Sequence, residues 1–171
     1  MNLKDYQTDF IERWGEMGQR WGIGRSEALV HGLLYLAPHP LSAEEIGETL
    51  VMARSNVSTS VKELERWGLV YKESRRGERK GYYRAETDVW TMAQRVIAER
   101  KKREADGALR SVEVCLQAAR DHGDPHTASR MEAMHGILSD ACRCADLALG
   151  CRPGLLKRAV QAAGSFFHWL G

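Results

Sequence analysis

Residues 41–85 constrain the fold of this chain more than any other segment, because they combine two short helices with a hairpin. Ser42 and Glu45 form a capping box, in which each side chain satisfies a backbone amide at the start of the first helix. The second helix is expected at residues 54–67, where apolar side chains recur with helical spacing. A hairpin of two short strands follows. The pattern predicts a winged helix-turn-helix.

The second of these helices carries two chemically different faces. Val57, Val61, Leu64 and Trp67 repeat at spacings of four, three and three, which makes one stripe for burial. The opposite face holds short hydrogen-bonding side chains and cations, the groups that contact base edges and phosphates in a major groove. We therefore predict DNA contacts from Arg54, Ser55, Asn56, Ser58, Thr59, Lys62 and Arg66.

The hairpin has expected strands at residues 69–73 and 80–84 and a basic tip between them. Arginine is favoured where the minor groove is narrow, because the negative potential is enhanced there. The tip residues expected to contact the minor groove or its flanking phosphates are Arg75, Arg76, Arg79 and Lys80.

Positive charge is concentrated in this part of the chain, although the whole chain carries a net charge of only +2. Residues 1–53 carry 4 basic and 8 acidic side chains, whereas residues 54–84 carry 9 and 4 and residues 85–171 carry 12 and 11. The local excess of positive charge is the electrostatic footprint expected of phosphate contact.

Short motifs within residues 20–90 add a family resemblance. They are NVS at 56–58, LERWGLV at 64–70, GERK at 77–80, YY at 82–83, GR at 24–25 and LLYL at 33–36. Together they resemble the GbsR-type branch of the MarR superfamily of winged helix-turn-helix transcriptional regulators. Many relatives have serine before the recognition helix, where this chain has Ala53, a poor N-cap. Either the helix start is weaker here or Ser55 caps it one turn later.

The rest of the chain predicts a mainly α fold with a DNA-binding domain at 1–86 and a helical dimerisation and effector-response region at 87–171. Thr87 is expected to cap a long helix that reaches about residue 122. A two-heptad seam on this helix predicts packing in a separate helical layer. Its members are Ala105, Leu109, Val112, Leu116 and Ala119. Further helices are expected at the N-terminus, residues 3–21 and 25–37, and at the C-terminus, residues 126–149 and 154–170.

The resemblance implies a small-molecule effector, of the osmolyte or choline class, and a quaternary ammonium binds best among aromatic rings. The aromatic residues expected to contribute are Tyr6, Trp14, Trp21 and Trp90. An alternative interpretation places Trp14 and Trp21 in a stripe that forms core or dimer contacts.

Other chemistry is not indicated by the sequence. No phosphate loop, nucleophile elbow, zinc-protease motif or dinucleotide fingerprint is present, so we expect neither an enzyme nor a cofactor. The four cysteines match no zinc motif and are expected to be small buried side chains, with a redox-sensing thiol as the alternative. Histidines at 122 and 126 are interpreted as loop residues rather than as metal ligands. No membrane span or signal peptide is indicated, and we expect a cytoplasmic protein.

These observations predict a homodimeric, sequence-specific DNA-binding transcriptional regulator that binds a pseudo-palindromic operator on double-stranded DNA. We expect a repressor that responds to a small molecule. The alternatives are a winged-helix module that binds protein rather than DNA, and a thiol-based redox switch on the same scaffold.

Overall fold

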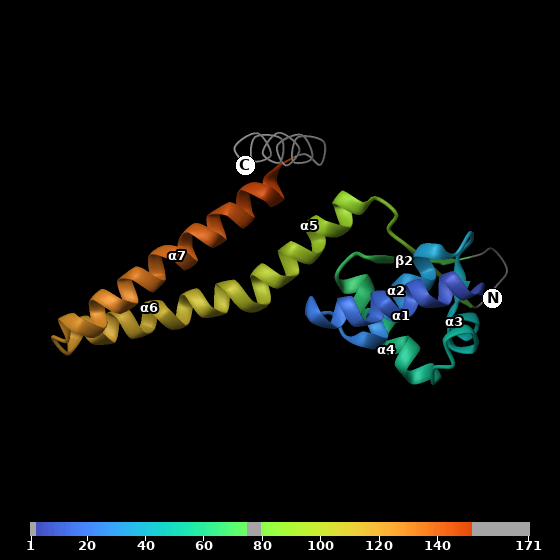
Figure 1. Cartoon of the computed structure of the whole chain (residues 1–171), viewed down its shortest axis with the longest axis horizontal. Coiled ribbons are helices and arrows are strands. Elements are labelled where there is room, and N and C mark those ends of the chain that lie inside the picture. The colour runs from blue at the N-terminus through green and yellow to red at the C-terminus, as the bar shows by residue number, and fades with distance from the viewer. Residues whose placement is uncertain (1–2, 75–79, 152–171) are drawn as a thin grey trace. The chain divides into compact units, whose positions relative to one another are not determined.

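A computed structural model describes residues 3–74 and 80–151 of the chain (Figure 1). It divides into two compact units, Met1–Met92 and Ala93–Gly171. In chain order the elements are α1 Asp5–Arg20, α2 Arg25–Leu36, β1 Leu41–Ser42, α3 Ala43–Leu50, α4 Arg54–Arg66, β2 Val70–Ser74, β3 Gly81–Ala85, α5 Val89–Arg100, the π-turn η1 Lys101–Ala105, α6 Asp106–Asp121 and α7 Pro125–Gly150.

The first unit packs four helices against a small antiparallel sheet with strand order β1-β3-β2. Val70 pairs with Ala85 at the base of the wing, and Leu41 of β1 pairs with Tyr83 of β3. The core lies between α1, α2, α3, α4 and the sheet. Its most completely buried side chains are Ile11, Val30, Leu33, Leu41, Ile46, Val57, Val61, Leu64, Leu69 and Val70.

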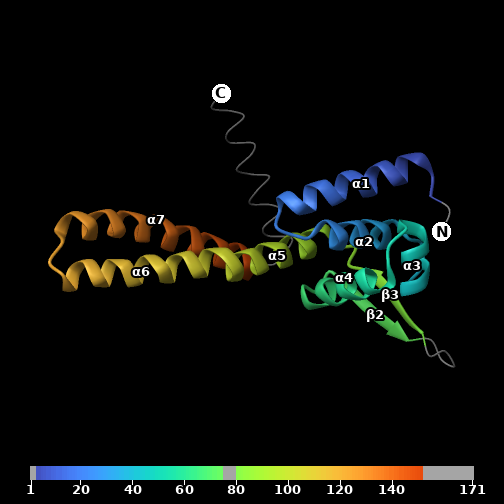
Figure 2. The same cartoon turned by 90° about the horizontal axis from the view of Figure 1, so that it is seen from below.

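The first two helices run alongside each other (Figure 2). A Cβ added at Gly18 would lie 2.4 Å from Ala28 Cβ, a distance that no side chain tolerates. A Cβ at Gly15 would lie 2.9 Å from a methyl carbon of Leu29. Glycine at these two positions therefore allows α1 to pack directly on the core helix α2.

The ends of α3, α4 and α5 were predicted from capping residues, and one of these predictions needs a correction. The capping box of α3 is confirmed, because the Ser42 hydroxyl accepts from the Glu45 amide and Glu45 Oε2 accepts from the Ser42 amide. Gly68 ends α4 with a φ of 70°. The prediction that Thr87 caps the long helix was wrong: Asp88 Oδ1 accepts from the Thr91 amide at 2.7 Å, so the cap lies one residue later.

The second unit contains a hairpin of α6 and α7, which lie side by side in both Figure 1 and Figure 2. The predicted seam is confirmed as its inner face, with Leu116 and Ala119 buried and the other three members half-buried. Cys142 of α7 is buried as well. Asp124 caps α7 by accepting from the Thr127 amide at 3.0 Å.

The predicted long helix contains a π-turn at Lys101–Ala105, which separates α5 from α6. The ammonium of Lys101 lies 3.0 Å from Asp106 Oδ1 and 3.3 Å from Asp146 Oδ1, and its side chain is only 18% exposed. These ion pairs tie the π-turn to α6 and α7. The helix predicted at residues 154–170 lies outside the described residues. Within the described ranges, no helix has the length and apolarity of a membrane span.

Candidate nucleic-acid interface

Helix α4 carries the two faces that its sequence predicts. Val57, Val61 and Leu64 are buried against the core, and Trp67 is buried at the C-cap. All seven residues predicted to contact DNA from this helix are exposed: Arg54, Ser55, Asn56, Ser58, Thr59, Lys62 and Arg66. The helix begins at Arg54 with Ala53 as an N-cap that makes no side-chain hydrogen bond. The alternative in which Ser55 caps the helix was therefore wrong.

One hydrogen bond joins α4 to α2, and two others join side chains near the end of α4 itself. Ser60 is only 1% exposed, and its hydroxyl donates to Glu27 Oε1 at 3.5 Å. Arg66 donates from its Nε to Glu63 Oε2 at 3.0 Å, and Trp67 Nε1 donates to Glu63 Oε1 at 3.1 Å. One predicted DNA contact, Arg66, is thus already paired on its own helix. Ser60 was missed from the sequence, although its spacing of three from Val57 places it beside the buried stripe.

The turn between α3 and α4 is tight and strained. Val51 has the left-handed backbone conformation, with φ 53° and ψ 47°, which β-branched residues rarely adopt. Its side chain is 93% exposed. The Met52 amide donates to the Gly47 carbonyl at 2.9 Å, and a Cβ at Gly47 would lie 3.1 Å from the Met52 carbonyl oxygen. Glycine at 47 therefore permits the close approach of the turn to α3.

The wing is described only in part. Three of its predicted DNA contacts, Arg75, Arg76 and Arg79, lie outside the described residues. The fourth, Lys80, is exposed and forms an ion pair with Glu44 of α3. On the strands, Arg84 pairs with Glu73 and lies over the ring of Tyr71, with 4.9 Å between the guanidinium carbon and the ring centroid.

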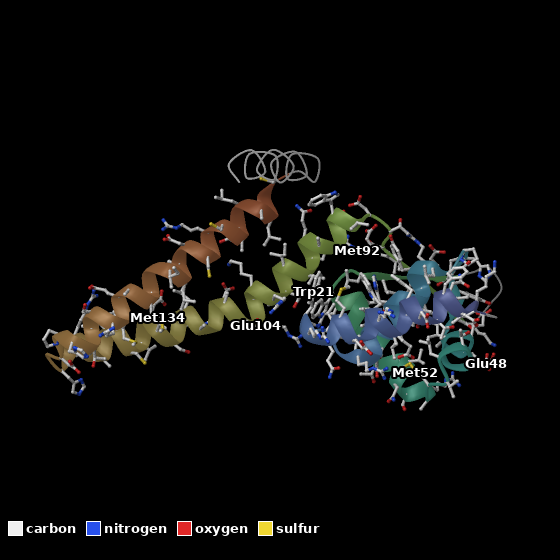
Figure 3. The ribbon with its side chains drawn as sticks, in the orientation of Figure 1. Trp21, Glu48, Met52, Met92, Glu104 and Met134 are labelled. Carbon is white, nitrogen blue, oxygen red and sulfur yellow. The ribbon has the colours of Figure 1, made fainter. Side chains whose placement is uncertain are left out.

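An open groove of about 790 Å³ lies between α3, the start of α4 and the base of the wing. Figure 3 labels Glu48 and Met52, which come from α3 and from the turn that follows it. The groove brings together three predicted contact residues from two separate elements, Arg54 and Ser58 of α4 and Lys80 of the wing. Its full lining is Ser42, Ala43, Glu44, Gly47, Glu48, Val51, Met52, Arg54, Ser58, Val61, Lys80, Gly81 and Tyr83.

Charge in this groove is mixed. The hydrogen bond from Lys80 and its positive charge lower the pKa of Glu44, and the charge of Arg54 lowers it further. The same hydrogen bond to Glu44 raises the pKa of Lys80. Both groups therefore stay ionised at neutral pH. The acidic partner was missed from the sequence, because Glu44 and Lys80 are separated by 36 residues.

The aromatic residues proposed for an effector occupy different environments. Trp14 Nε1 donates to His31 Nδ1 at 3.1 Å, and its ring stacks between Phe10 and His31. Tyr6 and Trp21 are 66% and 49% exposed, whereas Trp90 of α5 is half-buried. No ring contact among the described residues joins two of the four.

His31 is an unusual member of this aromatic stack. It is buried in α2, and burial lowers its pKa from 6.5 to about 4. Since Nδ1 accepts from Trp14, the neutral ring carries its hydrogen on Nε2. This Nε2 is buried and has no hydrogen-bond partner within the described part of the chain.

The cysteines are less uniform than predicted. Only Cys142 is buried, Cys151 is half-buried, and Cys115 and Cys144 are exposed. The prediction of buried side chains was wrong for these two, because they lie on the outer faces of α6 and α7. No cluster of three or more potential metal ligands occurs among residues 3–74 and 80–151.

The arrangement of α3, α4 and the β2–β3 wing on a helical core defines a winged helix-turn-helix domain. Residues 16–81 match the family model described as MarR family. The predicted resemblance to the MarR superfamily is confirmed over this segment.

The chain is similar to the "HTH-type transcriptional repressor GbsR" of Bacillus subtilis (strain 168), with 28% identity over 103 residues. The match covers 60% of this chain and only 57% of that repressor. The "Crystal Structure of a transcriptional regulator" shares the fold, with a TM-score of 0.64 and 22% identity over 85% of this chain and 96% of that chain. A MepR mutant of S. aureus bound to an oligodeoxyribonucleotide is more distant, with a TM-score of 0.41 and 16% identity over 77% of this chain and 92% of that chain.

Proposed function

We propose that this chain is a DNA-binding transcriptional regulator that binds a pseudo-palindromic operator as a homodimer and acts as a repressor. One observation carries the proposal: the face of α4 opposite its buried stripe is exposed and consists of hydroxyl, amide and cationic side chains. Such a face suits a major groove, where amide side chains bind adenine and cations bind guanine or phosphate. The similarity to a transcriptional repressor supports the choice.

The homodimer is supported by the surface of the helical hairpin. Met134, Ile137, Ala141 and Cys144 repeat along α7 at spacings of three, four and three, and all four are exposed. An apolar stripe of this period is the seam of a helix that packs against another helix. A second copy of the chain would cover this face. It would also bring two α4 helices into one assembly, and a pseudo-palindromic site requires two such helices.

The proposal includes a small organic effector of the osmolyte class. It is supported by the resemblance to GbsR-type regulators and by the exposed rings of Tyr6 and Trp21. A titration of tryptophan fluorescence with choline, betaine and carnitine tests it, with DNA binding measured in parallel. If millimolar concentrations change neither signal, the osmolyte class is eliminated, and the DNA-binding proposal stands independently.

The decisive experiment is selection of bound sequences from a random DNA pool, followed by fluorescence anisotropy on the selected site and on random DNA. We expect selected sites with two-fold symmetry and half-sites about 10 base pairs, or multiples of one turn, apart. Binding should weaken steeply between about 50 mM and about 200 mM salt, because phosphate contacts release counterions. The alternative, a module that binds only protein, predicts no enrichment and no salt-dependent binding.

A further inference from the structure

The groove between α3 and the wing contains acidic side chains where a DNA-binding surface is expected to be basic. Glu44 and Glu48 lie one helical turn apart on α3 and are both exposed. They line the groove together with Arg54 and Lys80, two predicted phosphate contacts. A phosphate that entered this groove would meet carboxylates as well as cations.

The two carboxylates differ in what they contact. Glu44 pairs with the Lys80 ammonium, and both side chains are 63% exposed, so the pair is open to solvent. The charge of Arg54 also acts on Glu44. Glu48, in contrast, contacts no cation within residues 3–74 and 80–151. Glu44 and Glu48 thus carry the same charge and lie on the same helix, but only Glu44 pairs with Lys80.

We propose that Glu44 is an intramolecular competitor of DNA phosphate for Lys80, and that it limits sequence-independent DNA binding. The inference rests on the proposed function. An exposed ion pair is weak, so a phosphate can displace the carboxylate from Lys80. Displacement leaves Glu44 unpaired in the groove, close to the incoming negative charge. Phosphate contact by Lys80 releases a condensed cation from the DNA, but the displaced carboxylate attracts a cation in its place, so the net release is less than one.

The competition acts on backbone contact and not on base reading. Asn56 and Thr59 do not line the groove, and Glu44 pairs with a residue of the wing. Its effect is therefore the same for every sequence. Sequence-independent binding is almost entirely electrostatic, and it sets how much protein is retained by the many competing sites of a genome.

The test compares Glu44→Gln with the matched control Glu48→Gln by fluorescence anisotropy on random duplex DNA over a range of salt concentrations. Both variants remove one negative charge from the same helix and groove, but only the first frees Lys80. We expect Glu44→Gln to steepen the log–log salt slope by up to about 0.9 and to strengthen binding roughly three- to eightfold at about 0.1 M salt. Glu48→Gln should change both quantities much less.

A second arm places Glu44→Gln in a Lys80→Gln background, where the gain should shrink to the size of the Glu48→Gln effect. Equal gains for Glu44→Gln and Glu48→Gln, or a full gain without Lys80, would overturn the competition. So would an unchanged slope in Glu44→Gln. Circular dichroism and urea unfolding check that each variant is folded. If the wild type and every variant bind no DNA at any salt concentration, the proposed function itself fails and the inference fails with it.

Discussion

The winged-helix unit and the helical hairpin bury their apolar residues to different extents. In the first unit Val30, Leu33, Ile46 and Val57 have no exposed surface. In the hairpin the described residues with buried apolar side chains are Leu116, Ala119 and Cys142, whereas Val114, Ile137 and Leu147 are each 70% exposed. A two-helix hairpin has too little interior to bury both of its apolar faces. The first unit therefore has a core of its own, whereas the described α6–α7 hairpin leaves apolar side chains that need a covering surface.

The largest expected effect is on dimer stability, when the exposed apolar face of α7 is changed. Replacing Ile137 by aspartate would place a charge in the proposed interface of each copy, and an unpaired buried charge costs about 3–5 kcal/mol. The dimer dissociation constant should rise by at least roughly a hundredfold. Light scattering should then give the 19.3 kDa mass of one chain instead of twice that value.

The conservative variant Ile137→Leu keeps the apolar surface and should remain dimeric at the same concentration. If Ile137→Asp has the wild-type mass and operator affinity, the face on α7 is not the interface.

Truncating a buried leucine is expected to lower the free energy of unfolding more in the first unit than in the second. Leu33→Ala removes a side chain enclosed on every side and should lower the free energy of unfolding by about 3–5 kcal/mol. Leu116→Ala acts in a seam only two helices thick, which can collapse around the lost volume, and should cost nearer to 2 kcal/mol. Urea unfolding of both variants measures the difference, and equal losses would contradict the contrast.

The pH dependence of stability should contain a component from the first unit. The pKa of His31 falls from 6.5 to about 4 on folding, because burial disfavours the charged ring. Between these values the unfolded chain binds a proton that the folded chain does not. Stability should therefore fall as the pH falls from 6.5 to about 4, by up to roughly 3 kcal/mol, and this component should level off below that.

The variant His31→Gln lacks the titrating group, so its loss of stability over this window should be smaller than that of the wild type. Urea unfolding at several pH values provides the comparison. Parallel pH curves for the two proteins would mean that His31 does not titrate in this way.

Asn56 tests whether base reading belongs to the first unit alone. Asn56→Ala should weaken binding to the selected operator by about 1–3 kcal/mol if the amide makes a bidentate base contact, and should weaken binding to random DNA much less. The mass of the dimer should not change. Equal losses on both DNAs would reassign Asn56 to phosphate contact.

The smallest effect is expected at the helix-turn-helix turn. Val51→Gly relieves a left-handed conformation that costs an L-residue roughly 1–2 kcal/mol, against a smaller entropic penalty. A gain near 1 kcal/mol should raise Tm by a few degrees. Gly68→Ala makes the reverse change at a φ of 70° and should lower Tm. A lower Tm for Val51→Gly would show that the valine side chain contributes contacts that offset its strain.

Features that depend on neighbouring residues could be predicted from the sequence. The faces of α4 and the seam of α6 followed from local periodicity, and the capping box of α3 followed from two residues three positions apart. Strand β1 was missed because two residues carry no alternation, and its pairing with β3 is a tertiary contact. The cap at Asp88 was missed because Thr87, the neighbouring residue, is also a capping residue by type.

Features that depend on distant contacts were beyond local reasoning. The pairing of Glu44 with Lys80 joins α3 to the wing, and the burial of Ser60 depends on α2. The exposure of Cys115 and Cys144 depends on which faces of α6 and α7 meet. A small apolar residue on an amphipathic helix can belong to either face, so periodicity alone did not decide between them.

The π-turn at Lys101–Ala105 has a consequence for how this helix tolerates changes in length. A π-turn contains one residue more than an α-helical turn would need, and it confines that residue to a single bulge. Deleting one residue here would yield a continuous α-helix in which both flanking segments keep their faces. Leu109 and Leu116 would still point at α7. A deletion a few residues later, inside the seam, would rotate it out of contact. The bulge thus marks the place where this helix can gain or lose a residue during evolution while α6 and α7 keep their contacts.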